Sequence, residues 1–245
     1  LFSFAPDYGG TLLTAHFPRS YIDVNRAADD IDSDLLHGGY WPEHQFGPID
    51  PTSRSDAGIG LIRRLVKPGV PVYDRYLSAE EIQARIQTCY NPYHTALEGL
   101  IEQAHYNFGE VWHINCHSMP HSSARPRMPR GIQGMQARHS DFVIGDRDAS
   151  TANQDFTHTL RDYLKKLGYH VSINDPFKGV ELVRRYSNPA RGRHSIQIEI
   201  NKSLYMDEET GEKNRNYTAL KSDIEKLVAF IAGYASEHLV PKAAD

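Results

Sequence analysis

The sequence has few cysteines, no strong excess of charge of either sign and no long hydrophobic run. Cys89 and Cys116 are too few for a disulfide framework, so a reducing cytoplasm is the expected compartment. A net charge of −4 gives no electrostatic reason to expect binding to nucleic acid or to an anionic membrane. No apolar segment approaches the ~20 residues of a membrane-spanning helix. The composition, with 40% hydrophobic and 24% charged residues, is that of an ordinary globular domain.

The beginning of the chain also lacks features of a complete N-terminus. Leu1 is not an initiator methionine, and the first residues show no signal-peptide pattern. Residues 1–9 are typical of the end of a helix stopped by Pro6 and by Gly9-Gly10. We therefore expect an N-terminal segment to precede them. Because the 245 residues contain no repeat, low-complexity tract or clean linker, they predict a single domain.

Helical and strand patterns alternate along the chain, which predicts an α/β fold with a sheet covered by helices. Ser78 followed by Glu81 forms a capping box, and Asn153 is expected to cap another helix. Three segments, 27–55, 120–140 and 177–193, are predicted to be long polar loops. The predicted helices are 56–66 (weakly), 79–90, 93–107, 154–167 and 216–238, and the predicted strands are 11–16, 21–24, 110–116, 142–144, 169–173 and the first part of 194–208.

His117 follows the buried strand predicted at 110–116. The carboxyl ends of strands are where ligands and catalytic groups gather in α/β proteins. An imidazole at such a place, followed by Ser118 and a turn, is suited to bind a metal ion. A structural histidine held by hydrogen bonds remains the alternative. Cys116 next to it cannot act as a thiol nucleophile with His117, because adjacent strand residues point to opposite faces.

Glu199 lies in a second strand pattern, in which isoleucines alternate with polar residues. Ile196, Ile198 and Ile200 are expected on one face, and Gln197, Glu199 and Asn201 on the other. A carboxylate within such a buried run costs several kcal/mol if it stays charged without a partner. Glu199 is therefore a candidate general base for a metal-bound water. A structural pair with an arginine of the preceding loop is the alternative.

Asn25 and Arg26 end the strand predicted at 21–24. An arginine there can hold a carboxylate through two parallel hydrogen bonds, and the asparagine adds a donor. The alternative is a surface salt bridge from Arg26 to Asp29 or Asp30.

Together these stretches resemble the N-formylglutamate amidohydrolases, which are related to the zinc carboxypeptidases and the aspartoacylase-type deacylases. The resemblance runs from about residue 10 to residue 210, and no single motif would establish it. The motifs, in chain order, are PRSYIDVNRAADDID, HINCHSMP, DFVIGDR, NDPFKGVELVRRYSNPARG and HSIQIEINKSLYMDE. The resemblance implies a three-layer αβα fold around a mixed sheet, like that of the zinc carboxypeptidases.

The resemblance also implies roles for individual residues. His117 matches a zinc ligand and Glu199 the general base. Asn25 and Arg26 match the pair that holds the substrate carboxylate, and Arg184 and Tyr186 match a stretch that reaches the substrate. The implied cofactor is one zinc ion, and its remaining ligands are expected upstream of Leu1. Asn115 stands where the family often has Asp, which would remove a carboxylate that supports the metal ligand.

The implied reaction is hydrolysis of N-formylglutamate to formate and glutamate, the last step of one route of histidine degradation. Two other functions stay open at this point. One is an amidase for another N-acyl amino acid on the same scaffold. The other is a metal-free binding protein that keeps the pocket without the chemistry.

Overall fold

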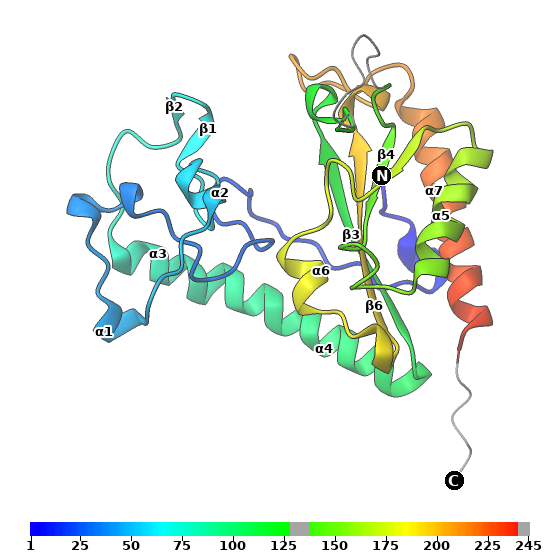
Figure 1. Ribbon diagram of the computed structural model, residues 1–245, viewed down its shortest axis with the longest axis horizontal. Coiled ribbons are helices and arrows are strands. Elements are labelled where there is room, and N and C mark those ends of the chain that lie inside the picture. Colours follow the sequence, from blue (N-terminus) through cyan, green and yellow to red (C-terminus); the bar gives the residue numbers. More distant parts are fainter. Residues whose placement is uncertain (128–137, 240–245) are drawn as a thin grey trace. The chain divides into compact units, whose positions relative to one another are not determined.

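The computed structural model describes residues 1–127 and 138–239 of the chain (Figure 1). The chain divides into two compact units. Unit 1 comprises Leu1–Leu12, Ile101–Gly179 and Val183–Asp245, and unit 2 comprises Leu13–Leu100 and Val180–Leu182. The expectation of a single domain stays a prediction.

Unit 1 is built on a four-stranded mixed sheet. Its strands, in the order β3-β6-β4-β5, are β3 (Val111–Met119), β6 (Arg193–Asn201), β4 (Phe142–Gly145) and β5 (Val171–Ile173). β3 runs parallel to β6, β6 runs antiparallel to β4, and β4 runs parallel to β5. This sheet and its helices confirm the predicted α/β class with a mixed central sheet.

The apolar face of this sheet packs against helices α5 (Gln154–Lys166) and α7 (Tyr217–Glu237), which lie side by side (Figure 1). Ile196, Ile198 and Ile200 are at most 1% exposed. Burying each such side chain contributes about 1.5–3 kcal/mol. α5 begins where the Asn153 side chain accepts a hydrogen bond from the backbone of Asp155, as predicted. The predicted alternation in β6 is therefore confirmed on its apolar side.

The opposite face of the sheet is polar and yet buried. Ser195, Gln197, Glu199 and Asn201 of β6 are all at most 7% exposed. Buried polar side chains are stable only when hydrogen bonds replace their lost water. The Asn201 side chain, for example, donates to the carbonyl of Ser140 at 3.0 Å. This polar face is the part of unit 1 that carries the candidate site.

Gly145 leaves room for the segment 178–179 to cross the polar face. A Cβ atom at this position would lie 2.6 Å from the carbonyl carbon of Lys178 and 2.7 Å from the backbone nitrogen of Gly179. We expect Gly145→Ala to lower the free energy of unfolding by about 1–3 kcal/mol, because the added methyl group must displace backbone. Gly99→Ala is the control: its Cβ meets nothing within 4 Å in a helix, so it should raise stability by about 0.5–1 kcal/mol. Urea titrations of both variants test this, and equal effects would contradict it.

Unit 2 is made of short elements around its own apolar cluster, which includes Ile22, Leu61 and Ile82. Strands β1 (Leu65–Lys67) and β2 (Val70–Pro71) form a small antiparallel hairpin. Helices α1 (Glu43–Phe46) and α2 (Ser53–Asp56) are one turn each. α3 (Ala79–Arg85) begins at Ser78, whose hydroxyl accepts from the backbone of Glu81 as the capping box predicts.

The helix that follows α3 continues past Pro92. A π-helical turn (Ile86–Tyr90) connects α3 directly to α4 (Asn91–Phe108), and the division between the two units falls within α4. The gap predicted between the helices 79–90 and 93–107 is therefore absent. A π-helical turn changes the hydrogen-bond pattern just before the proline, which accommodates its missing N–H.

Several other predictions about elements are also wrong. Residues 11–16 and 21–24 form no strand, and of the helix predicted at 56–66 only Asp56 is helical, as the last residue of α2. The polar segment 177–193 contains the short helix α6 (Glu181–Arg185), whose Leu182 and Val183 are buried. The described 3-10 helices are Ala5–Tyr8, Ser33–Leu35, His37–Gly39, His121–Ser123, Pro189–Arg191 and Lys202–Leu204. The part of the predicted 120–140 loop that spans 128–137 lies outside the described residues.

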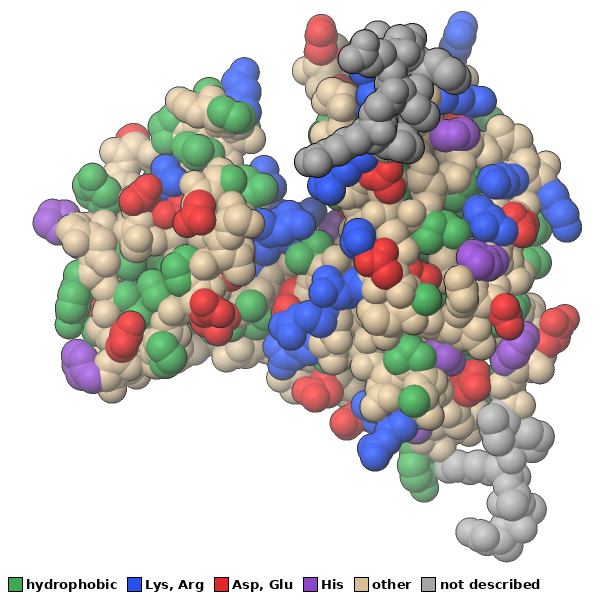
Figure 2. Space-filling model, in the orientation of Figure 1, with side chains coloured by type: hydrophobic (Ala, Val, Ile, Leu, Met, Phe, Trp, Pro, Cys, Tyr) green, Lys and Arg blue, Asp and Glu red, His purple; other side chains and the backbone are tan. Residues whose placement is uncertain are grey.

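Acidic and basic side chains both occur on the visible face of each unit (Figure 2). Among the helices of the described residues, none is both long enough and apolar enough to cross a membrane.

Candidate active site

His117 and Glu199 are direct neighbours on the polar face of the unit 1 sheet. β3 and β6 run parallel in a register that pairs Asn115 with Gln197 and His117 with Glu199. Paired residues of adjacent strands lie about 5 Å apart and point to the same face. His117 lies within β3, which continues to Met119, so its expected place just past the strand end is wrong. The strand is longer than predicted because Ser118 and Met119 also pair, with Ile200 and Asn201.

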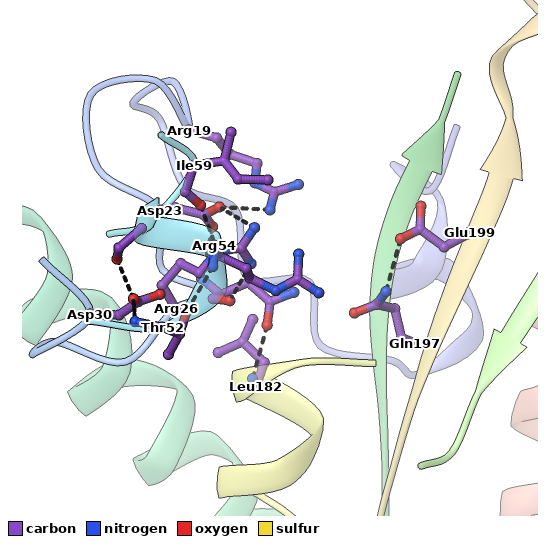
Figure 3. A network of polar contacts seen from close by, with 12 residues as sticks. Arg19, Asp23, Arg26, Asp30, Thr52, Arg54, Ile59, Leu182, Gln197 and Glu199 are labelled. Atoms are coloured by element: carbon purple, nitrogen blue, oxygen red, sulfur yellow. Dashed lines mark hydrogen bonds and ion pairs between the residues drawn. The ribbon is translucent and has the colours of Figure 1, made fainter. Parts of the chain in front are cut away.

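The carboxylate of Glu199 is held by a neighbouring amide. Gln197 Nε2 donates to Glu199 Oε1 at 2.8 Å, as the close-up in Figure 3 shows. Both side chains are buried. A donor at one carboxylate oxygen fixes the orientation of the group. The two-residue period of β6 places Gln197 on the same face as Glu199, but its role in holding that carboxylate is visible only in the folded chain.

A cavity of about 330 Å³ lies beside His117. It is bounded by the first residues of the chain, by β3 and β6, and by the start of α7. All of its lining residues belong to unit 1. Cys116 is exposed, and both cysteines are unpaired thiols. The lining residues are Leu1, Phe2, Cys116, His117, Ser118, Ile200, Tyr205 and Tyr217.

His113 lies on the same face of β3 as His117, four residues earlier. Its Nδ1 atom lies 2.7 Å from Ser195 Oγ of β6. Loss of water around the imidazole lowers the pKa of His113 to about 4, from an ordinary value of 6.5. His113 is therefore neutral at pH 7 and acts as a hydrogen-bonding group of the sheet.

This low pKa makes stability depend on pH. Between pH 6.5 and 4 the unfolded chain binds a proton at His113 that the folded chain does not, so stability falls as the pH falls through that window. We expect wild type to lose about 2 kcal/mol more of its free energy of unfolding than His113→Gln between pH 7 and pH 5. Urea titrations at both pH values give the comparison. Parallel losses in the two proteins would show that His113 does not carry the effect.

Asn25 and Arg26 lie in a turn of unit 2, not at the end of a strand. Side chains of other elements hydrogen-bond the carbonyl groups that a neighbouring strand would otherwise hold. Tyr90 donates to the carbonyl of Arg26 at 2.8 Å, and His94 Nε2 lies 3.0 Å from the carbonyl oxygen of Val24. Asn25 Oδ1 accepts from the backbone N–H of Leu182 at 2.9 Å. The segment is thus fixed by side chains from the π-helical turn and from α4, and no local sequence pattern indicates these contacts.

The guanidinium of Arg26 is buried beside a carboxylate. Its Nε donates to the carbonyl of Ile59 at 3.0 Å, its Nη1 donates to the carbonyl of Asn25 at 2.9 Å, and Nη2 lies 3.7 Å from Asp23. Burial lowers the pKa of Arg26 to about 10, opposed by the Asp23 charge and reinforced by the cation of Arg54. The surface salt bridge considered from the sequence is therefore wrong, since the ion pair is with Asp23 and Arg26 is only 4% exposed.

Asp23 is shared by two arginines. Arg19 Nη2 donates to its Oδ2 at 2.7 Å, and the backbone N–H of Asn25 donates to its Oδ1 at 3.0 Å. Burial would raise the pKa of Asp23, but Arg19 and Arg26 outweigh this and lower it. Asp23 is thus an anion at neutral pH that orients the turn containing Arg26.

Arg184 and Tyr186 belong to unit 1 and lie at the end of α6. Arg184 is exposed, whereas Tyr186 is buried, with the guanidinium of Arg185 5.4 Å from its ring centre. His117, Glu199, Arg184 and Tyr186 therefore come from unit 1, and Asn25 and Arg26 come from unit 2. The predicted site residues thus form three local pairs. His117 and Glu199 are paired across two neighbouring strands, whereas the other two pairs are each adjacent or nearly adjacent in the sequence.

Zinc requires three or four nitrogen, oxygen or sulfur ligands. Within residues 1–127 and 138–239, no three His, Cys, Asp or Glu side chains are grouped so that they could hold a metal ion. His117 offers one imidazole, and the Glu199 carboxylate is its neighbour in register. The described residues therefore fit one ligand of a zinc centre and do not complete it.

The fold and the polar face define the class: a mixed α/β protein whose paired imidazole and carboxylate lie near the carboxyl ends of two parallel strands, a usual position for an active site. Residues 1–206 match the family model of the N-formylglutamate amidohydrolases, and all six predicted site residues lie in that range. The chain belongs to the N-formylglutamate amidohydrolase family.

Individual relatives agree with this assignment. The crystal structure of N-formylglutamate amidohydrolase from Ralstonia eutropha JMP134 superposes with a TM-score of 0.87 at 42% identity, covering 97% of this chain and 82% of that one. N-formylglutamate deformylase of Pseudomonas putida is 26% identical over 211 residues, or 85% of this chain and 68% of the relative. The Pseudomonas aeruginosa deformylase is also 26% identical, over 85% of this chain and 69% of its own length. An Agrobacterium tumefaciens protein at 17% identity (TM-score 0.54) supports the fold alone.

Proposed function

We propose that this protein hydrolyses the amide bond of N-formylglutamate to give formate and glutamate. The carrying observation is the register of β3 and β6, which places the buried carboxylate of Glu199 beside the imidazole of His117. Membership of the family and the deformylase names of the Pseudomonas relatives support the choice of reaction and substrate.

Glu199 acts as the general base and then as the general acid. Its carboxylate, oriented by Gln197, accepts a proton as a water molecule attacks the formyl carbon. The resulting tetrahedral species collapses when the C–N bond breaks, and the same carboxyl group delivers its proton to the departing nitrogen. Water supplies one oxygen of formic acid, the hydrogen of its hydroxyl group and one hydrogen of the new amino group. The formyl C–H and the carbonyl oxygen are retained, and formic acid loses its hydroxyl proton to give formate, so the atoms balance.

His117 is proposed as one ligand of a catalytic zinc ion, with the other ligands contributed by residues outside those described. When bound, zinc would supply a Lewis acid that polarises the formyl carbonyl and lowers the pKa of its water. To bind the metal, the imidazole of His117 would need hydrogen bonds from its surroundings that keep it in the metal-binding tautomer.

The remaining site residues are proposed to bind substrate. Asn25 and Arg26 hold the α-carboxylate, because a guanidinium fixed by neighbouring carbonyls keeps a rigid orientation toward its anion. Arg184, exposed at the end of α6, supplies a cation for the oxyanion, and Tyr186 supports the same segment. A cytoplasmic location is retained as a prediction.

Formate release before and after treatment with a chelator tests the proposed chemistry. We expect activity on N-formylglutamate to fall at least tenfold and to return when zinc is added, and we expect zinc bound at equilibrium to fall in His117→Ala. Elemental analysis of the dialysed protein gives the second readout independently of activity. Full activity in the chelated protein would contradict the zinc proposal, and bound zinc without any formate release would contradict the proposed reaction.

A further inference from the structure

We propose that Arg54 binds the side-chain carboxylate of the substrate and so selects dicarboxylic N-acyl amino acids. This inference rests on the proposed function, since it assumes that Arg26 binds the α-carboxylate. The evidence is an excess of positive charge beside Arg26, donors that remain on Arg26, and the firm attachment of the short helix that carries Arg54.

Three arginines and two buried carboxylates, Asp23 and Asp30, gather in unit 2. Figure 3 shows Arg19, Arg26 and Arg54 near Asp23. Asp23 pairs with Arg19 at 2.7 Å and with Arg26 at 3.7 Å. Arg54 is close enough that its charge lowers the pKa of Arg26. Neighbouring like charges repel, so an anion that binds between the cations stabilises the group.

Arg26 retains donors for such an anion. A guanidinium carries five N–H bonds. Within the described part of unit 2, hydrogen bonds to the carbonyls of Ile59 and Asn25 use one N–H on Nε and one on Nη1. The contact from Nη2 to Asp23, at 3.7 Å, is longer than a hydrogen bond. A buried guanidinium with N–H bonds left over is suited to a carboxylate, which accepts from two of them at once.

Arg54 is held beside Arg26 by a rigid support. Asp30, only 2% exposed, accepts hydrogen bonds from the backbone of Thr52 at 2.8 Å and from the hydroxyl of Ser55. Thr52 Oγ1 in turn accepts from the backbone N–H of Arg54 at 3.1 Å. Helix α2 is therefore fixed at both flanks of Arg54. Among the described residues of unit 2, no carboxylate forms an ion pair with the Arg54 guanidinium.

The neighbouring cations of Arg26 and Arg54 suit a ligand that carries two carboxylates. N-formylglutamate has an α-carboxylate and a side-chain carboxylate, separated by a short flexible chain. With the first on Arg26, the second can meet the neighbouring cation of Arg54, and each charge-assisted contact adds both affinity and selectivity. A neutral side chain of the same shape, such as that of N-formylglutamine, would leave the Arg54 cation unpaired.

Steady-state kinetics on the purified protein with N-formylglutamate and N-formylglutamine tests this role. We expect Arg54→Gln to lower kcat/KM for N-formylglutamate by about 10- to 100-fold, mainly through KM, and to change kcat/KM for N-formylglutamine less than about twofold. Arg54→Lys should recover part of the loss. Arg63→Gln removes a charge from the same unit at a side chain outside these contacts, and it should leave both substrates unaffected.

Equal losses on both substrates, or no loss on either, would overturn the role of Arg54. A calorimetric titration with glutarate and butyrate separates this outcome from failure of the proposed function. If wild type releases no formate, the proposed reaction fails, while tighter binding of glutarate that Arg54→Gln removes still supports the dicarboxylate site. If glutarate binds wild type and Arg54→Gln equally, the site is wrong whatever the reaction.

Discussion

Glu199→Gln is expected to lower kcat for formate release from N-formylglutamate by about 10²- to 10⁴-fold, with KM changed less than about threefold. Glutamine has nearly the same shape as glutamate and can still accept the hydrogen bond from Gln197 Nε2 through its carbonyl oxygen. It cannot take a proton from the attacking water or return one to the departing nitrogen. The loss should therefore fall on the chemical step rather than on substrate binding.

Glu209→Gln is the matched control for this substitution. Glu209 is exposed in unit 1, so the same change of chemistry there should leave both kcat and KM unaltered. Circular dichroism and a urea titration of Glu199→Gln show whether the fold survives, as we expect from the isosteric change. A folded Glu199→Gln variant that retains kcat within a factor of ten would contradict the role of Glu199 as general base.

Arg26→Met is expected to lower the free energy of unfolding by about 3–5 kcal/mol, in addition to its effect on substrate binding. Removal of the guanidinium leaves the carbonyls of Ile59 and Asn25 without their donor, and it leaves Asp23 with Arg19 as its remaining ion-pair partner. Buried groups deprived of a partner lose the full free energy of their desolvation. The turn that carries Asn25 should therefore loosen.

The urea midpoint of Arg26→Met is best compared with that of Arg161→Met. Arg161 pairs with Asp162 at 2.8 Å on the surface of α5, and exposed ion pairs contribute about 0–1 kcal/mol. The double variant Asp23→Asn with Arg26→Met should lose less stability than the sum of the single losses, because the two side chains share one network. A loss below about 1 kcal/mol in Arg26→Met would show that the buried pair does not hold this turn.

The strands of unit 1 could be predicted because their burial follows the two-residue period. Ile196, Ile198 and Ile200 face the helices, so the pattern reveals both the strand and its apolar face. The same period is misleading at Ile22 and Val24. Both are buried in the cluster of unit 2, but the intervening Asp23 serves the arginines, and the carbonyls bond to side chains instead of to another strand. Periodicity reports which residues are buried and not which backbone partners they have.

The sequence allowed individual site residues to be identified, but it did not show which residues they contact. A polar residue within a buried strand indicated Glu199, and an arginine after a short apolar run indicated Arg26. The register that pairs His117 with Glu199 depends on contacts between segments about 80 residues apart. Tyr90, Asp23 and Arg54 contact or influence Arg26 only after the chain folds, and their spacing in the sequence carries no signal of this.

The rate of formate release from N-formylglutamate, set beside acetate release from N-acetylglutamate under the same conditions, tests the central claim most directly. Both substrates have two carboxylates, so they differ only at the acyl group that is removed. The proposed function predicts that kcat/KM for formate release from N-formylglutamate is at least 100-fold higher than kcat/KM for acetate release from N-acetylglutamate. A protein that releases no formate, or that releases acetate faster, would contradict it.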